Sequence, residues 1–169
     1  GAQVYDNGIL SMTGGSISTN SSGAAASGEA IFTSSNAKVT LTGTSIQNYF
    51  YGIMLRSNAV VDITGITISN CKWPLYYQSS ADLTVHGTNN LTGNVNTAIS
   101  LAMTSISDTL TLPVLNLPYV SLGGLTINTG ERLVIGSGNI LKFQLSYGLV
   151  VNGSMKAEAN PGEYIYFTS

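Results

Sequence analysis

Few side chains in this sequence could carry out acid–base or metal chemistry, and those that could are scattered. Only 8% of the 169 residues are charged, and eight of them are acidic. Polysaccharide hydrolysis needs two or three carboxylates within several ångströms, and a uronate lyase needs a strong base beside acidic calcium ligands. The acidic residues fall mostly in different repeats or at turns. The sequence therefore predicts no catalytic residue, no metal site and no cofactor.

The chain's single histidine and single cysteine give no reason to change that prediction. His86 follows a run of alternating residues with no acidic partner evident, so we interpret it as a solvated surface residue. Asp62 has only the uncharged Thr40 and Thr84 as equivalents in the neighbouring repeats. Cys71 follows Asn70 at an expected strand end, which favours a small buried or turn residue over a reactive thiol.

The elements that must position these residues belong to a repeat. Residues 29–50, 51–72 and 73–94 are three copies of one 22-residue unit, in which Ile31 aligns with Ile53 and Leu75. Self-similarity at a fixed period of this size is typical of solenoids. Each unit contains three short runs of alternating residues rich in Ile, Val and Thr, which favour strands over helices. The pattern predicts triangular coils whose equivalent residues stack about 4.8 Å apart.

The whole chain, 1–169, is predicted to form a single domain of such coils. Regular coils should occupy 1–94, with a loop insertion near 20–28, because the first coil matches the next only after a seven-residue offset. An irregular coil should occupy 95–124, where Pro113 and Pro118 indicate corners. Regular coils resume over 125–169 and are expected to be truncated or uncapped.

One corner of each coil should carry a stack of asparagines. Asn7, Asn36 and Asn58 align between the first and second expected strands of successive coils. Asparagine tolerates the left-handed conformation, and its side-chain amide can bond to equivalents above and below. We therefore expect an amide ladder at this corner.

The sequence GIMLRSNAVVDITGITISN at 52–70, with asparagine at one corner, resembles the repeats of right-handed parallel β-helix proteins of the pectin-lyase-like superfamily. The segment from Leu125 to Ser169 resembles repeats of bacterial secreted and cell-surface β-helix proteins. The resemblance implies an all-β, right-handed parallel β-helix with three strands per coil. It also implies that a catalytic site, if present, would lie on the outer face of the third strand. The outward positions there are all uncharged: Ser16, Ser18, Ser45, Gln47, Thr67, Ser69, Asn90 and Thr92.

Two other outer faces could bind a ligand. On the strand before the asparagine corner, Phe32, Met54 and Tyr76 form one outward column, with Arg56 and Gln78 beside it. Exposed aromatic rings flanked by arginine and glutamine could stack on sugar rings. The alternative is that the 20–28 loop or a neighbouring domain covers this stripe.

The strand after the asparagine corner offers two columns of hydroxyl side chains, the pattern of β-helical ice-binding proteins. Asp62 and His86 interrupt the array, and threonine is also common on any solvated strand. The columns are Ser11, Thr40, Asp62 and Thr84, and then Thr13, Thr42, Thr64 and His86.

Composition and charge indicate which kinds of partner this protein could bind. A net charge of −2 without a basic run predicts no nucleic-acid partner, and no apolar run is long enough for a transmembrane segment. A surface of Gly, Ser, Thr and Asn suits a secreted or cell-surface protein. The sequence favours a non-catalytic extracellular structural or adhesive module, assembling end to end with itself or with the rest of a longer surface protein. The alternatives are a carbohydrate-binding or polysaccharide-cleaving β-helix and, third, an ice-binding protein.

Overall fold

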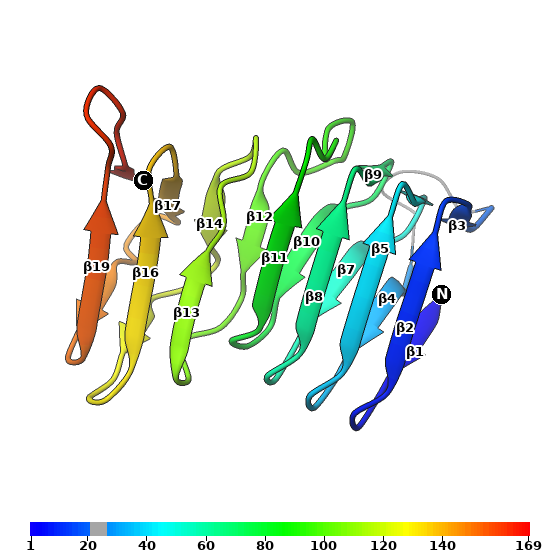
Figure 1. Ribbon diagram of the computed structural model, residues 1–169. Coiled ribbons are helices and arrows are strands. Elements are labelled where there is room, and N and C mark those ends of the chain that lie inside the picture. Colours follow the sequence, from blue (N-terminus) through cyan, green and yellow to red (C-terminus); the bar gives the residue numbers. More distant parts are fainter. Residues whose placement is uncertain (21–26) are drawn as a thin grey trace.

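The computed structural model describes residues 1–20 and 27–169, which form a stack of about six coils (Figure 1). All regular elements in these two ranges are β-strands, and all of their ladders are parallel. The predicted all-β solenoid with coils of about 22 residues is therefore confirmed. The described ranges contain no helix that could span a lipid bilayer. The predicted insertion near 20–28 lies largely outside the described residues.

One sheet, which we call the long sheet, runs through the entire stack. Its eight strands pair in this order: β1 (Ala2–Val4), β4 (Glu29–Thr33), β7 (Tyr51–Leu55), β10 (Trp73–Tyr77), β12 (Ile99–Leu101), β14 (Tyr119–Ser121), β17 (Ile140–Phe143) and β20 (Tyr166–Thr168).

A second row of strands lies at the front of Figure 1 and is divided into two sheets. The first, which we call the hydroxyl sheet, comprises β2 (Ile9–Thr13), β5 (Lys38–Thr42), β8 (Val60–Thr64) and β11 (Asp82–His86). The second comprises β13 (Thr109–Leu112), β16 (Arg132–Gly136) and β19 (Ser154–Glu158). The 22-residue offset expected between Leu133 and Met155 is confirmed by their pairing.

The third strand of a coil does not keep the same place in the order of strands along the chain. In the first three coils the third strand follows the hydroxyl sheet, as β3 (Ser16–Ser18), β6 (Ser45–Gln47) and β9 (Thr67–Ser69). Later in the chain it precedes the front row, as β15 (Leu125–Ile127) and β18 (Leu149–Val151). The switch falls in the segment predicted to be irregular, and Pro113 and Pro118 lie in the corner between β13 and β14.

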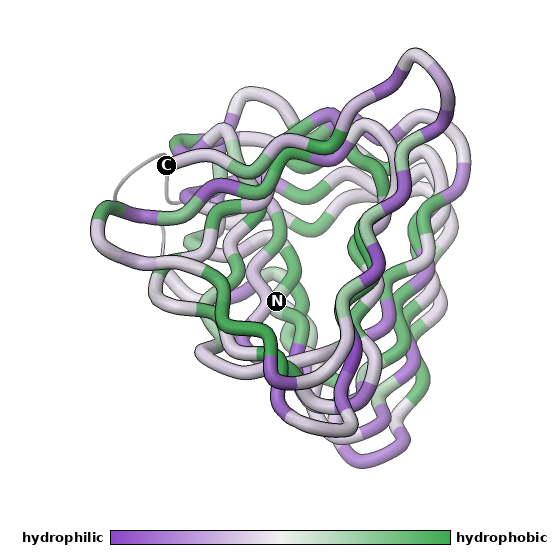
Figure 2. Tube along the Cα trace, turned by 90° about the vertical axis from the view of Figure 1, so that its left-hand side faces the viewer, coloured by the Kyte–Doolittle hydropathy of each residue, from purple (hydrophilic) through white to green (hydrophobic). Residues whose placement is uncertain are grey.

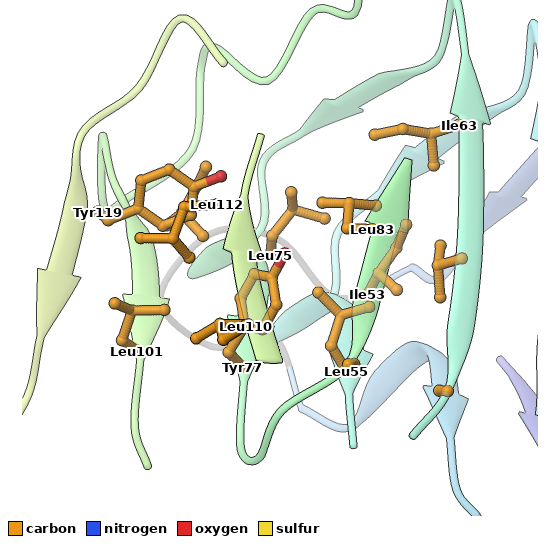
Figure 3. Packing of buried hydrophobic residues seen from close by; sticks show 14 of the residues in the cluster. Ile53, Leu55, Ile63, Leu75, Tyr77, Leu83, Leu101, Leu110, Leu112 and Tyr119 are labelled. Atoms are coloured by element: carbon orange, nitrogen blue, oxygen red, sulfur yellow. The ribbon is translucent and has the colours of Figure 1, made fainter. Parts of the chain in front are cut away.

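The interior consists of the predicted aliphatic columns (Figure 3). Ile31 pairs with Ile53 and Ile53 with Leu75, and all three are fully buried. Where the third side switches, two tyrosines fill the core instead, because Tyr77 and Tyr119 are fully buried with ring centroids 6.4 Å apart. The Tyr119 hydroxyl donates to the Pro113 carbonyl at 2.7 Å, whereas the Tyr77 hydroxyl has no hydrogen-bond partner among residues 1–20 and 27–169.

The sheet of the third side ends at β9. Beyond it, buried asparagine side chains hydrogen-bond to backbone groups of β9 and of the residues on either side of it. The Asn94 side chain accepts a bond from the Cys71 N–H at 2.9 Å and donates to the Ile68 carbonyl at 2.8 Å. Asn89 accepts a bond from the Ile66 N–H at 2.9 Å. These amides pair backbone groups that would otherwise be buried without partners. Cys71 is fully buried, as predicted, and burial raises the pKa of its thiol.

The asparagine corner has the predicted conformation but a different hydrogen-bond pattern. Asn7, Asn36 and Asn58 adopt φ values of 67°, 60° and 59°. The bonds that join successive coils here come from backbone amides, such as the Asn58 N–H donating to the Ser80 carbonyl at 3.0 Å. The Asn36 and Asn58 side chains are exposed. The expected ladder of side-chain amides is therefore wrong, because the left-handed backbone already directs its own N–H along the stack.

This corner gives a first testable expectation. Alanine at position 58 would hold a left-handed conformation that costs an ordinary residue about 1–2 kcal/mol, whereas asparagine and glycine adopt it readily. We expect Asn58→Ala to lower the free energy of unfolding by about 1 kcal/mol in urea denaturation. Asn58→Gly is the matched control and should change it little. Equal losses in both variants would show that the side chain, not the backbone conformation, matters here.

Candidate functional site

The outer surface of the long sheet gathers aromatic side chains over β4, β7 and β10. Phe32 pairs with Met54 and Met54 with Tyr76, so the column predicted from the sequence is confirmed in register. Phe32 and Tyr76 are partly exposed. Parallel pairing is what brings these residues together, because each lies 22 positions from the next in the chain.

Two further aromatic residues join this surface because the alternation of the strands is broken. In β7 and β10 the second and third residues are both buried, namely Gly52–Ile53 and Pro74–Leu75. A Cβ atom on Gly52 would lie 2.7 Å from the interior side chain of Ile68 and 2.5 Å from the Pro74 carbonyl oxygen. Two consecutive positions of each strand therefore face the interior. As a result, Tyr51 and Trp73 lie on the same outer surface as Tyr76 and are partly exposed. We call Phe32, Tyr51, Trp73 and Tyr76 the aromatic face.

Tyr51 packs closely against two neighbouring rings, one of them within the aromatic face. The ring centroids of Tyr51 and Tyr76 are 4.3 Å apart, and those of Phe50 and Tyr51 are 4.6 Å apart. Partial burial, followed by the neighbouring Tyr76, raises the pKa of Tyr51 to about 12. The Tyr51 hydroxyl is therefore neutral at physiological pH and can donate a hydrogen bond. Tyr5 extends the surface at the other end, with its ring centroid 5.4 Å from that of Phe32.

Met54 does not offer the contact surface that the sequence suggested. Its side chain is only 7% exposed, so it supports the rings around it rather than facing solvent. The stripe also ends at Tyr76, because its partner in the next coil, Ser100, is completely buried. Residues 21–26 of the predicted covering loop lie outside the described residues.

Charged and amide side chains border the aromatic face. The Arg56 guanidinium carbon lies 5.2 Å from the centroid of the Phe32 ring, and the Lys72 ammonium lies 4.5 Å from that of Phe50. Gln78 is exposed one coil beyond Arg56, as predicted. Glu29 pairs with Tyr51 across the strands and is partly exposed. Hydrogen-bond donors and acceptors therefore border the ring surface, in which Tyr51 and Tyr76 are tilted by 50° against each other.

No protein-family profile matches this chain, and comparisons with curated proteins and with solved structures find no match either. Function must therefore be argued from these surfaces alone.

The hydroxyl sheet also has the predicted register. Ser11, Thr40, Asp62 and Thr84 pair in succession, and so do Thr13, Thr42, Thr64 and His86. The expectation that His86 and Asp62 lack charged neighbours is wrong. The His86 Nε2 atom lies 3.5 Å from Asp62 Oδ2, because the two residues occupy adjacent columns on neighbouring strands and meet diagonally.

The third side, where the resemblance would place catalysis, pairs in the expected register. Ser45 pairs with Thr67 and Gln47 with Ser69, and an isolated bridge joins Thr67 to Asn90. The hydrogen bonds of these side chains are short-range, such as Gln47 Nε2 donating to Ser45 Oγ at 3.2 Å. These pairings bring no charged side chain to that face.

Proposed function

We propose that this protein is a non-catalytic structural and adhesive module of an extracellular surface, and that its aromatic face binds carbohydrate chains. The observation that carries the proposal is the group of partly exposed rings on the long sheet, with Tyr51 and Tyr76 4.3 Å apart. A low charge content and an exterior of hydroxyl and amide side chains support an extracellular location.

Sugar chains suit the shape and chemistry of this surface. The C–H groups of a pyranose pack on the face of an aromatic ring, and the hydroxyls at its rim need donors and acceptors. Trp73 and Tyr76 lie in one strand, three positions apart, and Tyr51 lies beside them in the preceding coil. Arg56, Gln78 and Glu29 border the rings. An extended chain could lie across several coils at once, which favours a polymer over a small ligand.

The test is glycan binding by the whole chain and by single variants. Wild-type protein is screened on an array of cell-wall and cell-surface oligosaccharides, and the best binders are then measured by titration calorimetry. Truncating an aromatic anchor commonly costs more than about 1.4 kcal/mol of binding energy, or tenfold in Kd. We therefore expect Tyr76→Ala and Trp73→Ala each to weaken binding by about tenfold or more.

The matched control is Tyr147→Ala, which removes a 54% exposed tyrosine from a different coil and should leave binding unchanged. Circular dichroism and thermal melts confirm that each variant is folded. Equal losses in the control and the face variants, or no binder on the array, would contradict the proposal. Release of shortened products from a bound polysaccharide would contradict its non-catalytic part and favour the polysaccharide-cleaving alternative.

A further inference from the structure

We propose that His86 and Asp62 form an open binding site for a divalent transition-metal ion, Zn²⁺ foremost, on the hydroxyl sheet. This site is separate from the aromatic face, which lies on the long sheet, and it does not depend on carbohydrate binding.

The first argument is the spacing of the two ligand atoms. Zn²⁺ binds histidine nitrogen and carboxylate oxygen at about 2.0–2.2 Å, almost always with tetrahedral geometry. Two such ligands at the tetrahedral angle lie about 3.3–3.5 Å apart. His86 Nε2 and Asp62 Oδ2 are 3.5 Å apart, so one ion can bind both atoms with little shift of either side chain. A direct N–H···O bond between them would be shorter, at about 2.7–2.9 Å.

The second argument is that rigid strands hold both side chains. Asp62 is the middle residue of β8, and His86 is the last residue of β11. The two strands pair over their full length, from Val60 opposite Asp82 to Thr64 opposite His86. A site on paired strands loses little conformational freedom when the ion binds.

The third argument is access and electrostatic environment. The His86 side chain is 57% exposed and that of Asp62 is 39% exposed, so an ion can reach them without any movement of the backbone. The residues that pair directly with Asp62 and His86 are the uncharged threonines Thr40, Thr64 and Thr84, and the nearest cation along the sheet is Lys38, which pairs with Val60 and so lies diagonally from Asp62.

The described residues contain no group of three or more His, Cys, Asp or Glu side chains placed to bind one ion. The protein therefore supplies two ligands, and water or an outside donor fills the other positions. Such an open site binds more weakly than a four-ligand structural site, and its ion exchanges readily.

The test uses the full chain without a polyhistidine tag, titrated with ZnCl₂ by calorimetry at pH 7.5. We expect one ion per chain, with affinity reduced by about tenfold or more in His86→Ala and in Asp62→Asn. The matched control is Asp82→Asn, which removes another exposed carboxylate from β11 and should retain wild-type affinity. Co²⁺ provides a second readout, because a bound ion develops a visible absorption band that both ligand variants should lose.

Two results would overturn the proposal. One is the absence of saturable Zn²⁺ binding at millimolar ion concentration, which would leave the pair as a surface ion pair. The other is binding that persists unchanged in both ligand variants, which would place the ion elsewhere. Thermal melts without metal show whether the variants are folded, since neither residue belongs to the buried core.

Discussion

Ile53→Ala should remove about 2–5 kcal/mol from the free energy of unfolding. Ile53 is fully buried in the middle of β7, where it pairs with Ile31 of the preceding coil and with Leu75 of the next. Figure 3 shows Ile53 and Leu75 in the interior. Its contacts lie above and below within one column, so truncation leaves a void that strand pairing prevents from closing. Total stabilities of about 5–15 kcal/mol are usual, so this loss would be a large fraction. Urea denaturation followed by far-UV circular dichroism measures it.

The control for that expectation is Ile9→Ala in β2. Ile9 is 78% exposed, and exposed substitutions usually change stability by less than about 0.5 kcal/mol. The two variants remove the same atoms from two five-residue strands, one from a buried side chain and one from an exposed side chain in the end strand of its sheet. Similar unfolding midpoints for both would contradict the assignment of Ile53 to a tightly packed interior.

Tyr77→Phe should stabilise the protein, which is unusual for a change at a fully buried residue. The Tyr77 hydroxyl lies in the core with no hydrogen-bond partner in the part of the chain that the structure describes, and burial raises the pKa of this residue far above its ordinary value. A buried polar group without a partner costs about 1–3 kcal/mol. Phenylalanine keeps the ring that fills the interior and removes that cost, so we expect the free energy of unfolding to rise by about 1 kcal/mol.

Tyr119→Phe is the matched comparison and should act in the opposite direction. Its hydroxyl donates to the Pro113 carbonyl at 2.7 Å, so its removal should lower stability by about 1 kcal/mol. Both residues are fully buried in the same part of the core. A loss of stability in both variants would indicate that the Tyr77 hydroxyl has a partner in solution, such as a buried water molecule.

The sequence predicted those features that repeat at a constant interval. The columns Ile31–Ile53–Leu75 and Thr42–Thr64–His86 followed from the 22-residue offset, because residues one coil apart must stack in a solenoid. The left-handed asparagines followed equally directly. Those predictions needed no knowledge of how neighbouring columns interact.

Two features of the surface do not follow from the repeat and from strict alternation of inward and outward residues. Tyr51 and Trp73 were missed because alternation assigns them to the side of Ile53 and Leu75, whereas two consecutive inward residues reverse that assignment. Glycine at 52 and proline at 74 were the available hint, since both residues disturb a regular strand. The 22-residue offset does not predict the contact between His86 and Asp62, because that contact is diagonal between columns and the offset relates residues of one column only.

The switch of the third side was not predicted either, because residues 95–124 lack the repeat that would have revealed their register. Viewed along the stack, coils of somewhat different outline overlap around a common interior (Figure 2). The long sheet continues across the switch, but there β10 and β12 pair through only two residue pairs, and the front row is interrupted between β11 and β13.

That interruption bears on the cooperativity of unfolding. In a solenoid each coil contacts only its neighbours, so stability is a sum of coil terms and of interface terms between adjacent coils. The interface at the switch includes the short β10–β12 pairing, the bond from the Ser107 N–H to Ser80 Oγ at 2.8 Å, and the Tyr77–Tyr119 contact. The β10–β12 ladder is shorter than the ladders between the earlier coils, so we expect this interface to couple the coils on its two sides weakly. We therefore expect the coils before it and those after it to act as two folding units whose amide protons exchange with separate free energies of opening.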